Sequence, residues 1–544
     1  MPRLDRMPGS AMPASAQAVN VIAKQFVVVI FARLRAMPRI LPRLSAQADR
    51  LRRLLKPVVA FYYNLYYWFY RQYLGLESRV PVTAPCQSSE YCKREVVMQI
   101  PVITILGSQE PLVESAAAAL EARAPTIPFT QAALPQGMRL DPTIPAIPLG
   151  TGRMGEMSAD SMGPATSQSF AVRAMLEVED PQAIPEQVDG RPLFADPVIE
   201  PFLTCGGTPP VGDAALVAKH LGVATLAGRG MDGTDVAIAV MDTGINLTHL
   251  RNKLGFMPRI DAANSWTVPG STTLPFQHPV HHGTMCAYDA LIAAPNATLL
   301  DFPILRNNAP GGSSMGGTLS VALAAFSHVL GSWAVAFAAG GLRRYKSLVL
   351  NNSWGIFHPS WDFPAGHPGR FCDNPRHPFN LVIGTLAGTD VDILFAAGNC
   401  GAQCADMRCS GRVTGAIMGS SALPEVLTLA GCDTNDLRVG YSSQGPSIAG
   451  MFQNKPDLTS YTHFLGSEAF GAGSPDSGTS TACPVAAGCV AALRTKLPSS
   501  TLPTANLFSQ LMATARKPAG QTTWNGDYGH GYLDPLATAQ SFGV

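Results

Sequence analysis

Short continuous runs of apolar residues recur along the C-terminal part of the chain. They cover residues 236–241, 297–300, 348–350, 393–397 and 426–430. Runs of this kind are typical of strands that are buried on both faces of a parallel sheet. Between them lie apolar stretches of helix length, including residues 315–338 and 379–386. This alternation predicts a doubly wound α/β fold from about residue 201 onward, with a mostly parallel sheet and helices on both faces.

The region before residue 201 has different patterns. In residues 170–178 the apolar side chains Phe, Val, Ala, Leu and Val alternate with Ala, Arg, Met and Glu, a period-two pattern that indicates a half-buried strand. Residues 125–164 contain seven prolines with Gly, Ser and Met between them, and this composition favours an extended linker. We therefore expect a leader in residues 1–80, a proline-rich linker with a propeptide-like or accessory region in residues 81–200, and the α/β domain in residues 201–544.

The leader is locally cationic and aromatic. Residues 1–56 carry eleven basic and two acidic side chains, and residues 58–70 are aromatic and apolar. That apolar segment is short for a membrane span and rich in the tyrosines that prefer a membrane interface. Two interpretations of the leader stay open: peripheral membrane contact, or a helix that packs or a segment that is poorly ordered. There is no clear signal peptide, because arginines separate the apolar residues 26–32 from the possible cleavage site Ala-Gln-Ala at 46–48. An extracellular, cell-envelope or membrane-associated location is nevertheless favoured.

The composition excludes two broad classes of protein. The 544 residues include 39 Lys plus Arg against 38 Asp plus Glu, so no net field attracts nucleic acid to the whole chain. With 46% hydrophobic and 14% charged residues, the chain can build a large core and is not disordered throughout. Eleven cysteines are an odd number, so at least one stays unpaired within the chain.

Four polar residues stand where predicted strands end or predicted helices begin. Asp242 follows the run 236–241 and Asn399 follows the run 393–397, while His282 and Ser480 open helical stretches. The carboxyl ends of parallel strands share one edge of a sheet, where ligands bind. There Ser480 can act as a nucleophile, His282 as its general base and then acid, and Asp242 as the group that fixes the imidazole tautomer. The Asn399 amide and the Ser480 backbone N–H can stabilise an oxyanion.

These residues lie in segments that together resemble the subtilisin family of serine proteases (subtilases, peptidase family S8). The resemblance covers roughly residues 213–540. It rests on VAIAVMDTGI around Asp242, HGTMCA at His282, NNSWG from Asn351, LFAAGN ending at Asn399, YSSQGP from Tyr441, KPDL from Lys455, GTSTACPVAAG around Ser480 and GHGYLDPLAT near the C-terminus. It implies a serine endopeptidase, acting on a peptide or protein substrate, with a catalytic domain that is expected to be monomeric.

The resemblance also implies a substrate site. A bound peptide would pair as an added strand with two segments that flank the pocket for the residue before the cleaved bond: Ser353, Trp354, Gly355, Ala396, Ala397 and Gly398. The alternative for Trp354 is that its side chain fills the core. Cys286 and Cys483 are expected to be buried, and Cys286 resembles the thiol of the proteinase K branch. No metal or cofactor is required, although structural calcium would fit the family.

Two insertions follow the predicted site segments, between residues 355 and 379 and between residues 400 and 412. Because functional variation concentrates in loops, we expect both to shape substrate access, and we expect the extra His358, His367 and His377 to be surface or structural residues. Three alternatives stay open for the cysteines of this region: disulfides, reduced thiols or a zinc site. The cysteines concerned are Cys400, Cys404 and Cys409, with Cys372 or Cys432. Their spacing lacks the paired CxxC knuckles of zinc sites.

Two other functions compete with the serine peptidase. Asp242-Thr243-Gly244 and Asp476-Ser477-Gly478 have the paired form of an aspartic protease, but the α/β setting argues against it. A catalytically inactive scaffold or binding protein at a membrane is the non-enzymatic alternative.

Subtilases resemble one another in carrying an N-terminal segment that assists folding and then covers the active site. Residues 170–178 and a turn at Asp189-Gly190 are candidates for part of such a propeptide, with residues 125–164 as a tether. A parallel domain depends on slow non-local pairing, so a preformed template would speed folding. We expect a zymogen whose active form begins between residues 180 and 213; otherwise residues 81–200 are a permanent accessory domain.

Overall fold

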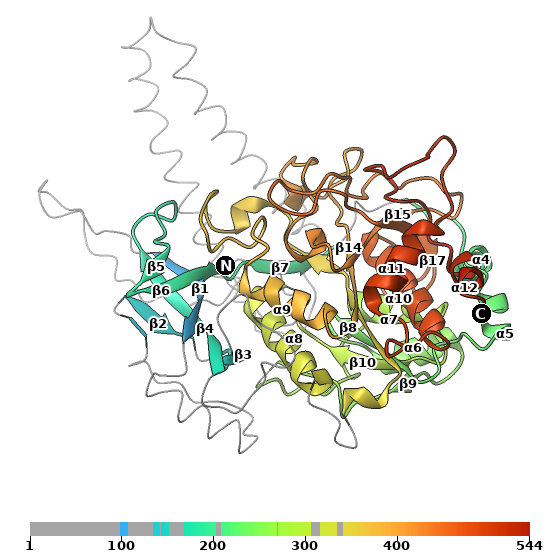
Figure 1. Ribbon diagram of the computed structural model, residues 1–544, viewed down its shortest axis with the longest axis horizontal. Coiled ribbons are helices and arrows are strands. Elements are labelled where there is room, and N and C mark those ends of the chain that lie inside the picture. The colour runs from blue at the N-terminus through green and yellow to red at the C-terminus, as the bar shows by residue number, and fades with distance from the viewer. Residues whose placement is uncertain are drawn as a thin grey trace, which may run out of the picture. The chain divides into compact units, whose positions relative to one another are not determined.

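Two sheets of unequal size dominate the fold (Figure 1). The structure, a computed structural model, describes residues 98–106, 134–135, 137–141, 143–151, 168–202, 208–268, 270–305, 316–334 and 341–544. The expected leader, residues 1–80, lies outside the described residues, and with it the interpretation of membrane contact. None of the helices in the described part of the chain is long and apolar enough to cross a membrane.

Within the described residues the larger sheet has seven strands, and every neighbouring pair is parallel. In spatial order the strands are β16 (Leu458–Tyr461), β15 (Leu427–Cys432), β14 (Asp392–Ala396), β12 (Ser347–Asn352), β8 (Val236–Met241), β10 (Thr298–Phe302) and β9 (Arg259–Ile260). Each of the five predicted apolar runs falls on one of these strands. The prediction of a doubly wound, mostly parallel α/β fold is confirmed.

Each face of this sheet builds its own core, as the alternation in β8 shows. Val236, Ile238 and Val240 join one cluster, whereas Ala237 and Ala239 join the other. The first cluster includes residues of helices α4 (Ala214–His220), α5 (Val223–Gly228), α6 (Leu247–Leu254), α7 (His282–Leu291), α10 (Thr479–Arg494), α11 (Thr504–Ala513) and α12 (Pro535–Ser541). The second includes α8 (Leu319–Ala334) and α9 (Pro378–Ala387).

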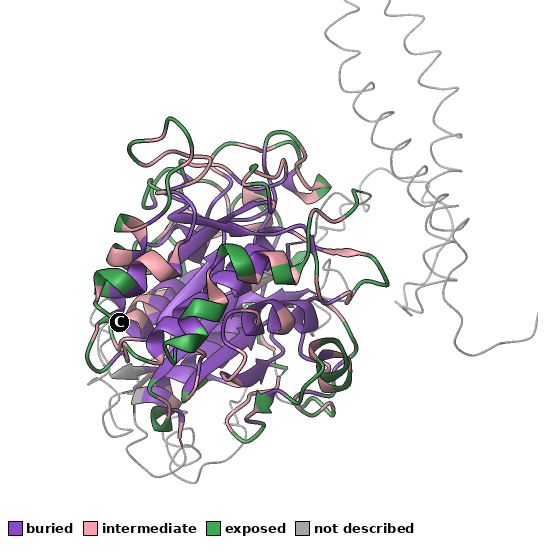
Figure 2. Cartoon of the chain, turned by 90° about the vertical axis from the view of Figure 1, so that its right-hand side faces the viewer, coloured by how far each residue is buried: buried purple, intermediate pink, exposed green. Residues whose placement is uncertain are grey.

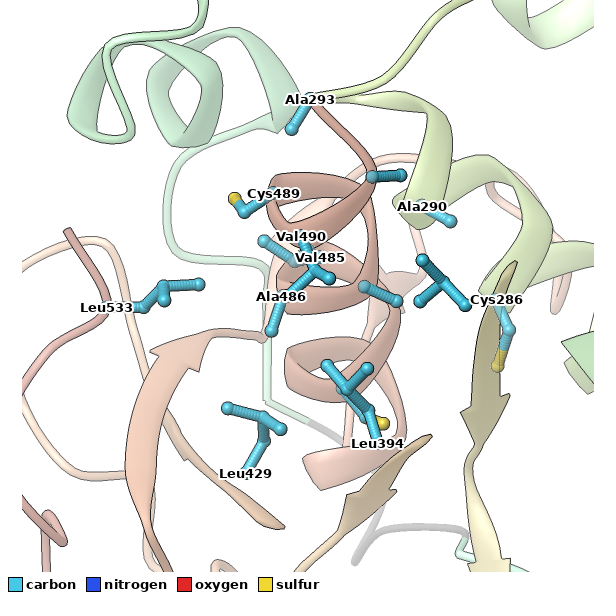
Figure 3. Packing of buried hydrophobic residues seen from close by; sticks show 14 of the residues in the cluster. Cys286, Ala290, Ala293, Leu394, Leu429, Val485, Ala486, Cys489, Val490 and Leu533 are labelled. Carbon is cyan, nitrogen blue, oxygen red and sulfur yellow. The ribbon is translucent and has the colours of Figure 1, made fainter. Parts of the chain in front are cut away.

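Every residue of helix α10 is buried. Figure 2 shows buried residues, in purple, inside the domain behind a layer of partly exposed elements. Its side chains meet the sheet at Leu394 and Leu429 and meet helix α7 at Cys286 and Ala290 (Figure 3). Pro484 lies in the second turn, so it removes the hydrogen bond that a residue at this position would donate to the Ser480 carbonyl. That carbonyl accepts instead from the Ser353 hydroxyl at 2.9 Å and from the Cys286 thiol at 3.5 Å. The packing fixes the start of α10, and therefore the position of Ser480.

The smaller sheet precedes the parallel domain and is antiparallel. Its strands are β1 (Met98–Leu106), β2 (Met138–Leu140), β3 (Ile147–Thr151), β4 (Gln168–Val178), β5 (Gln187–Val188) and β6 (Arg191–Ala195). Strand β4 confirms the strand predicted at residues 170–178, but the predicted half-burial is wrong for its first part, because Ala171 and Arg173 on the other face are buried as well. Asp189 and Gly190, both with positive φ, form the predicted turn between β5 and β6.

The prediction that residues 125–164 are only an extended linker is wrong for part of that segment. Strands β2 and β3 form inside it and pair with β4. The reason is that Met138 and Ile147 each bury an apolar side chain in a core. The prolines at neighbouring positions do not prevent strand formation, because a strand at a sheet edge tolerates proline.

The insertion after Gly355 packs on the small sheet. Phe363 completes the apolar core of that sheet, the Gly369 carbonyl accepts a hydrogen bond from the Ala195 N–H, and buried His377 contacts the Ala195 carbonyl through Nε2. Burial lowers the pKa of His377 to about 3, so this histidine is neutral and structural. The later part of this insertion therefore contacts β6, whereas Phe357 near its start packs against the Phe202 ring. The expectation that the insertion shapes substrate access stays a prediction.

The remaining elements are short. They are strands β7 (Val198–Pro201), β11 (Gly317–Thr318), β13 (Trp354–Gly355), β17 (Phe464–Leu465) and β18 (Pro475–Asp476), and 3₁₀ helices η5 (Leu342–Arg344), η6 (Pro359–Trp361), η7 (Met407–Cys409) and η8 (Gly419–Ala422). Strand β7 connects the two sheets in the sequence and runs from the small sheet towards the large one (Figure 1).

Candidate active site

Asp242 and His282 form a buried hydrogen-bonded pair. Asp242 follows the last residue of β8 and His282 is the first residue of α7. His282 Nδ1 lies 2.9 Å from both carboxylate oxygens of Asp242, and the Thr243 N–H donates to the same carboxylate at 2.7 Å. A carboxylate on Nδ1 leaves Nε2 as the basic nitrogen of the neutral imidazole. Within the described residues, Nε2 has no hydrogen-bond partner.

Cys286 lies one helical turn beyond His282 and is fully buried, as expected. Its sulfur is 3.7 Å from an Asp242 carboxylate oxygen, 3.8 Å from His282 Nδ1 and 3.5 Å from the Ser480 carbonyl oxygen. Burial, together with the nearby Asp242 charge, raises the pKa of the Cys286 thiol well above its usual value. The protonated thiol is a packing residue between the groups of the site and a poor nucleophile.

Asp242, His282 and Cys286 also form the one group of side chains in the described part of the chain with the spacing of a metal site. Their ligand atoms lie within 4.8 Å of one another. Sulfur and imidazole nitrogen are not ligands that calcium prefers, so this group does not fit the calcium that the family resemblance raised. The calcium expectation stays a prediction.

Ser480 is the second residue of α10 and is fully buried. Its hydroxyl oxygen lies 3.0 Å from the Phe202 carbonyl oxygen and 3.1 Å from the Ser353 carbonyl oxygen. A hydroxyl has one hydrogen to donate, so these two carbonyls share it. Ser480 therefore bonds to the backbone of two other segments rather than to His282.

Asn399 is held beside Ser480 by its side-chain oxygen. Asn399 Oδ1 accepts hydrogen bonds of 3.0 Å from both the backbone N–H and the hydroxyl of Thr479. A Cβ on Gly478, which has φ of 90°, would lie 2.9 Å from Asn399 Nδ2 and 3.0 Å from the Phe202 carbonyl oxygen. The amide nitrogen and that carbonyl oxygen therefore border one small space, which only glycine at position 478 leaves open.

Strand β7 is the middle strand of a three-stranded sheet, between β11 and β13, and the space between these two strands that β7 and Phe202 fill is called the cleft below. Val198 and Ile199 pair antiparallel with β11, and Glu200 and Pro201 pair antiparallel with β13. The Phe202 N–H donates to the Ser353 carbonyl at 3.3 Å. This is the strand-addition geometry by which proteins bind extended peptides, and here the chain's own residues supply the peptide.

The Phe202 ring fills the pocket beyond β13 and is 4% exposed. A Cβ on Gly355 would lie 2.6 Å from the tip of this ring and one on Gly398 would lie 3.5 Å from it, while Phe357 packs edge-on at 5.1 Å between centroids. Ser353, Gly355 and Gly398, all predicted for substrate binding, thus contact one residue. The Trp354 indole packs in the core, and buried Ala396 and Ala397 belong to the two cores.

Asp196 anchors the start of β7 to the large domain. Its carboxylate accepts hydrogen bonds from the N–H and hydroxyl of Ser320 at the start of α8, at 2.7 and 2.9 Å, and from Arg173 of β4 at 2.6 Å. A carboxylate at a helix N-terminus is favoured by the unpaired N–H groups there. The small sheet and the cleft strand are therefore tied to α8 by buried polar contacts.

The two Asp-containing tripeptides do not form a carboxylate pair. Asp242 contacts His282, whereas Asp476 accepts hydrogen bonds from Ser467 and interacts with the carboxyl group of Asp289. Burial raises the pKa of Asp476 to about 6 and raises that of Asp289 well above its usual value, with the Asp476 charge as a further cause. These contacts and the parallel fold overturn the aspartic-protease alternative.

The second insertion is closed by a disulfide between Cys400 and Cys409. Cys372 and Cys432 are buried free thiols, so they are not the partners that were considered for this region. Burial raises the pKa of both thiols well above the usual value. A disulfide, rather than a zinc site, holds this loop next to Asn399.

The chain belongs to the subtilase family, whose sequence pattern matches residues 233–531. Subtilases are serine peptidases, so the family supports that class of activity. The chain is 28% identical over 338 residues to the membrane-bound transcription factor site-1 proteases of Homo sapiens and Mus musculus. The match covers 60% of this chain and 27% of each relative, so the chain spans about a quarter of their length.

Sequence reasoning missed three residues of the cleft. It did not identify Phe202 as the occupant of the pocket, Phe357 as a wall of it, or Arg408 as a neighbour of β7. Phe357 had a local signal, since an aromatic residue directly follows the segment NNSWGI. Phe202 and Arg408 had none, because their partners are far away in the sequence.

Proposed function

We propose that the chain is a serine endopeptidase that uses Ser480, His282 and Asp242 as its catalytic triad. The Ser480 oxygen attacks the carbonyl carbon of the substrate while its proton passes to His282 Nε2. Asp242 stabilises the imidazolium through Nδ1. When the C–N bond breaks, that proton goes to the leaving amine, and a water molecule then releases the acyl group by the same steps.

Asn399 and the Ser480 backbone N–H are the proposed oxyanion donors. The carbonyl oxygen of Phe202 borders the same space as Asn399 Nδ2, where charge develops during attack. The start of α10 adds a helix dipole of favourable sign at that point. These groups therefore offer stabilisation that grows as the carbonyl becomes tetrahedral.

One observation carries this proposal: β7 occupies the cleft in the manner of a substrate, with the Phe202 carbonyl oxygen 3.0 Å from the Ser480 hydroxyl. We infer that the bond after Phe202 is the first bond the enzyme cuts, in its own chain. Residues up to Phe202 are then a propeptide that blocks the cleft until it leaves. This cleavage point lies within the range 180–213 expected from the sequence.

An active-site probe tests the activity. A fluorophosphonate should label the processed wild-type protein and should fail to label Ser480→Ala, and the N-terminus of the labelled form should be Leu203. Equal labelling of the two proteins, or a folded wild-type protein that neither labels nor hydrolyses any peptide after the propeptide is removed, would favour the inactive scaffold.

A further inference from the structure

Glu200 of β7 has a buried ionic partner in the cleft. It lies two residues before Phe202, and its side chain is 7% exposed. Arg408 Nη1 donates to Glu200 Oε2 at 2.7 Å, and the Arg408 side chain is 22% exposed. A charge-assisted hydrogen bond with so little solvent access is stronger than a surface ion pair, so it stabilises β7 in the cleft.

Arg408 takes its orientation from the peptidase domain rather than from Glu200. Its guanidinium donates through Nε and Nη2 to the two oxygens of Asp406, at 3.0 and 2.9 Å, and lies 3.6 Å from the centroid of the Phe357 ring. Burial alone would lower the pKa of Arg408, but the hydrogen bonds to Asp406 and Glu200 raise it. Because Asp406 holds one edge of the guanidinium and Phe357 contacts one face, Nη1 stays directed at the cleft after β7 has left.

The loop that carries Arg408 is braced against the oxyanion residue. The disulfide between Cys400 and Cys409 closes it, and the Asp406 N–H donates to the Asn399 carbonyl at 2.9 Å. Asp406 also caps the turn η7 by accepting from the Arg408 N–H at 2.8 Å. The position of Arg408 relative to Ser480 is therefore set by covalent and backbone links.

We propose that Arg408 is a specificity-determining residue that selects substrates with a carboxylate at the third residue before the cleaved bond. The preferred class is then a peptide with Glu or Asp at that position and a large apolar residue, such as Phe, directly before the bond. The inference rests on the proposed endopeptidase activity and deepens it. A Lys side chain at the same position would bring an ammonium group towards Arg408, which is unfavourable.

The test compares three peptide amides that share the sequence of β7 and Phe202, Val-Ile-Glu-Pro-Phe, and differ only in Glu, Gln or Lys at the third position. The processed wild-type enzyme should cleave the Glu peptide about tenfold more efficiently than the Gln peptide in kcat/KM, with the Lys peptide slowest. The ratio should fall as salt is added. In Arg408→Met the Glu-to-Gln ratio should approach one, and in Arg408→Lys it should be intermediate.

Arg412→Met is the matched control, since Arg412 lies on the same loop region and donates to the Gly415 carbonyl. It should keep the wild-type Glu-to-Gln ratio. If Arg408→Met fails to mature, self-processing gives a second measurement: Glu200→Gln should slow it about tenfold, and adding Arg408→Lys to Glu200→Gln should slow it little further.

Each outcome has one meaning. Equal cleavage of the Glu, Gln and Lys peptides by an active wild-type enzyme overturns the inference and leaves the endopeptidase standing. A Glu preference that persists in Arg408→Met also overturns it. Absence of hydrolysis of all three peptides by processed wild type overturns the proposed function itself.

Discussion

The two halves of the site differ in what holds them. The Asp242 and His282 half is complete within the large domain, with a carboxylate and an imidazole 2.9 Å apart. The Ser480 half is completed by β7, because the hydroxyl bonds to the Phe202 carbonyl and not to His282. The Asp242–His282 pair is thus formed within the large domain, whereas the Ser480 hydroxyl is held by the Phe202 and Ser353 carbonyls. Under the proposed function this difference describes a zymogen caught with its first substrate in place.

The largest effect should come from removing the nucleophile. Ser480→Ala is expected to lower peptide hydrolysis more than about a thousandfold, and the chain should accumulate at full length because self-cleavage is lost. Hydrolysis rates and gel mobility measure both results. Ser474→Ala, in the loop before the site, is the control and should mature normally. Full-length protein with equal activity in wild type and Ser480→Ala would mean that residues 81–200 are a permanent accessory domain.

The oxyanion residue should rank second. Asn399→Ala is expected to lower kcat by about 10²–10³ with little change in KM, because its amide acts when charge develops on the carbonyl oxygen. The variant also loses the acceptor for Thr479, so its melting temperature must be compared with that of wild type. A loss that appears mainly in KM would contradict the proposed role.

The contact of β7 with the Ser480 half of the site can be weakened by shortening Phe202, whose ring fills the pocket. Phe202→Ala is expected to slow self-processing about 10- to 100-fold, since burying a phenylalanine contributes roughly 1.5–3 kcal/mol. A refolding time course with N-terminal sequencing measures it. Phe256→Ala, at a residue that is 40% exposed, is the control. If Phe202→Ala is still cut after residue 202 at the wild-type rate, the pocket does not determine the cleavage site.

The smallest effect concerns a carboxyl pair that connects the two halves. Asp289 belongs to α7, which begins with His282, and Asp476 ends strand β18, four residues before Ser480. Because burial raises both pKa values in the fold, the native state holds protons more tightly than the unfolded chain. Their contribution to stability is therefore full below about pH 4 and declines as pH rises through about 6.

Asp289→Asn removes this proton requirement while keeping the shape of the side chain. In a Ser480→Ala background that prevents self-digestion, the variant should gain stability relative to its parent as pH rises, by on the order of 1–2 kcal/mol at neutral pH. Thermal melts from pH 4 to pH 8 measure the difference. Exposed Glu179→Gln should show no such trend, and a constant offset at every pH for Asp289→Asn would mean that the pair is ionised in the fold.

The sequence by itself determined the parallel sheet and the edge at which polar residues meet. Strands buried on both faces must be continuously apolar, so β8 and β14 are visible as local runs, and Asp242 and Asn399 follow from where those runs stop. The glycines and serine that open α10 are local signals too. Alternation likewise revealed β4, whose two faces have different surroundings.

Only the tertiary structure decided what fills the cleft and what the insertions contact. Residues 198–202 have no pattern that distinguishes them from any short strand, and Ser480 contacts Phe202 across 278 positions of sequence. Glu200 and Arg408 are 208 positions apart, and nothing local to either predicts their pairing. The first insertion docks on β6 through Phe363, and cysteine spacing left the partner of Cys400 open. Periodicity records which face of an element is buried, whereas the identity of the neighbour depends on how distant segments pack.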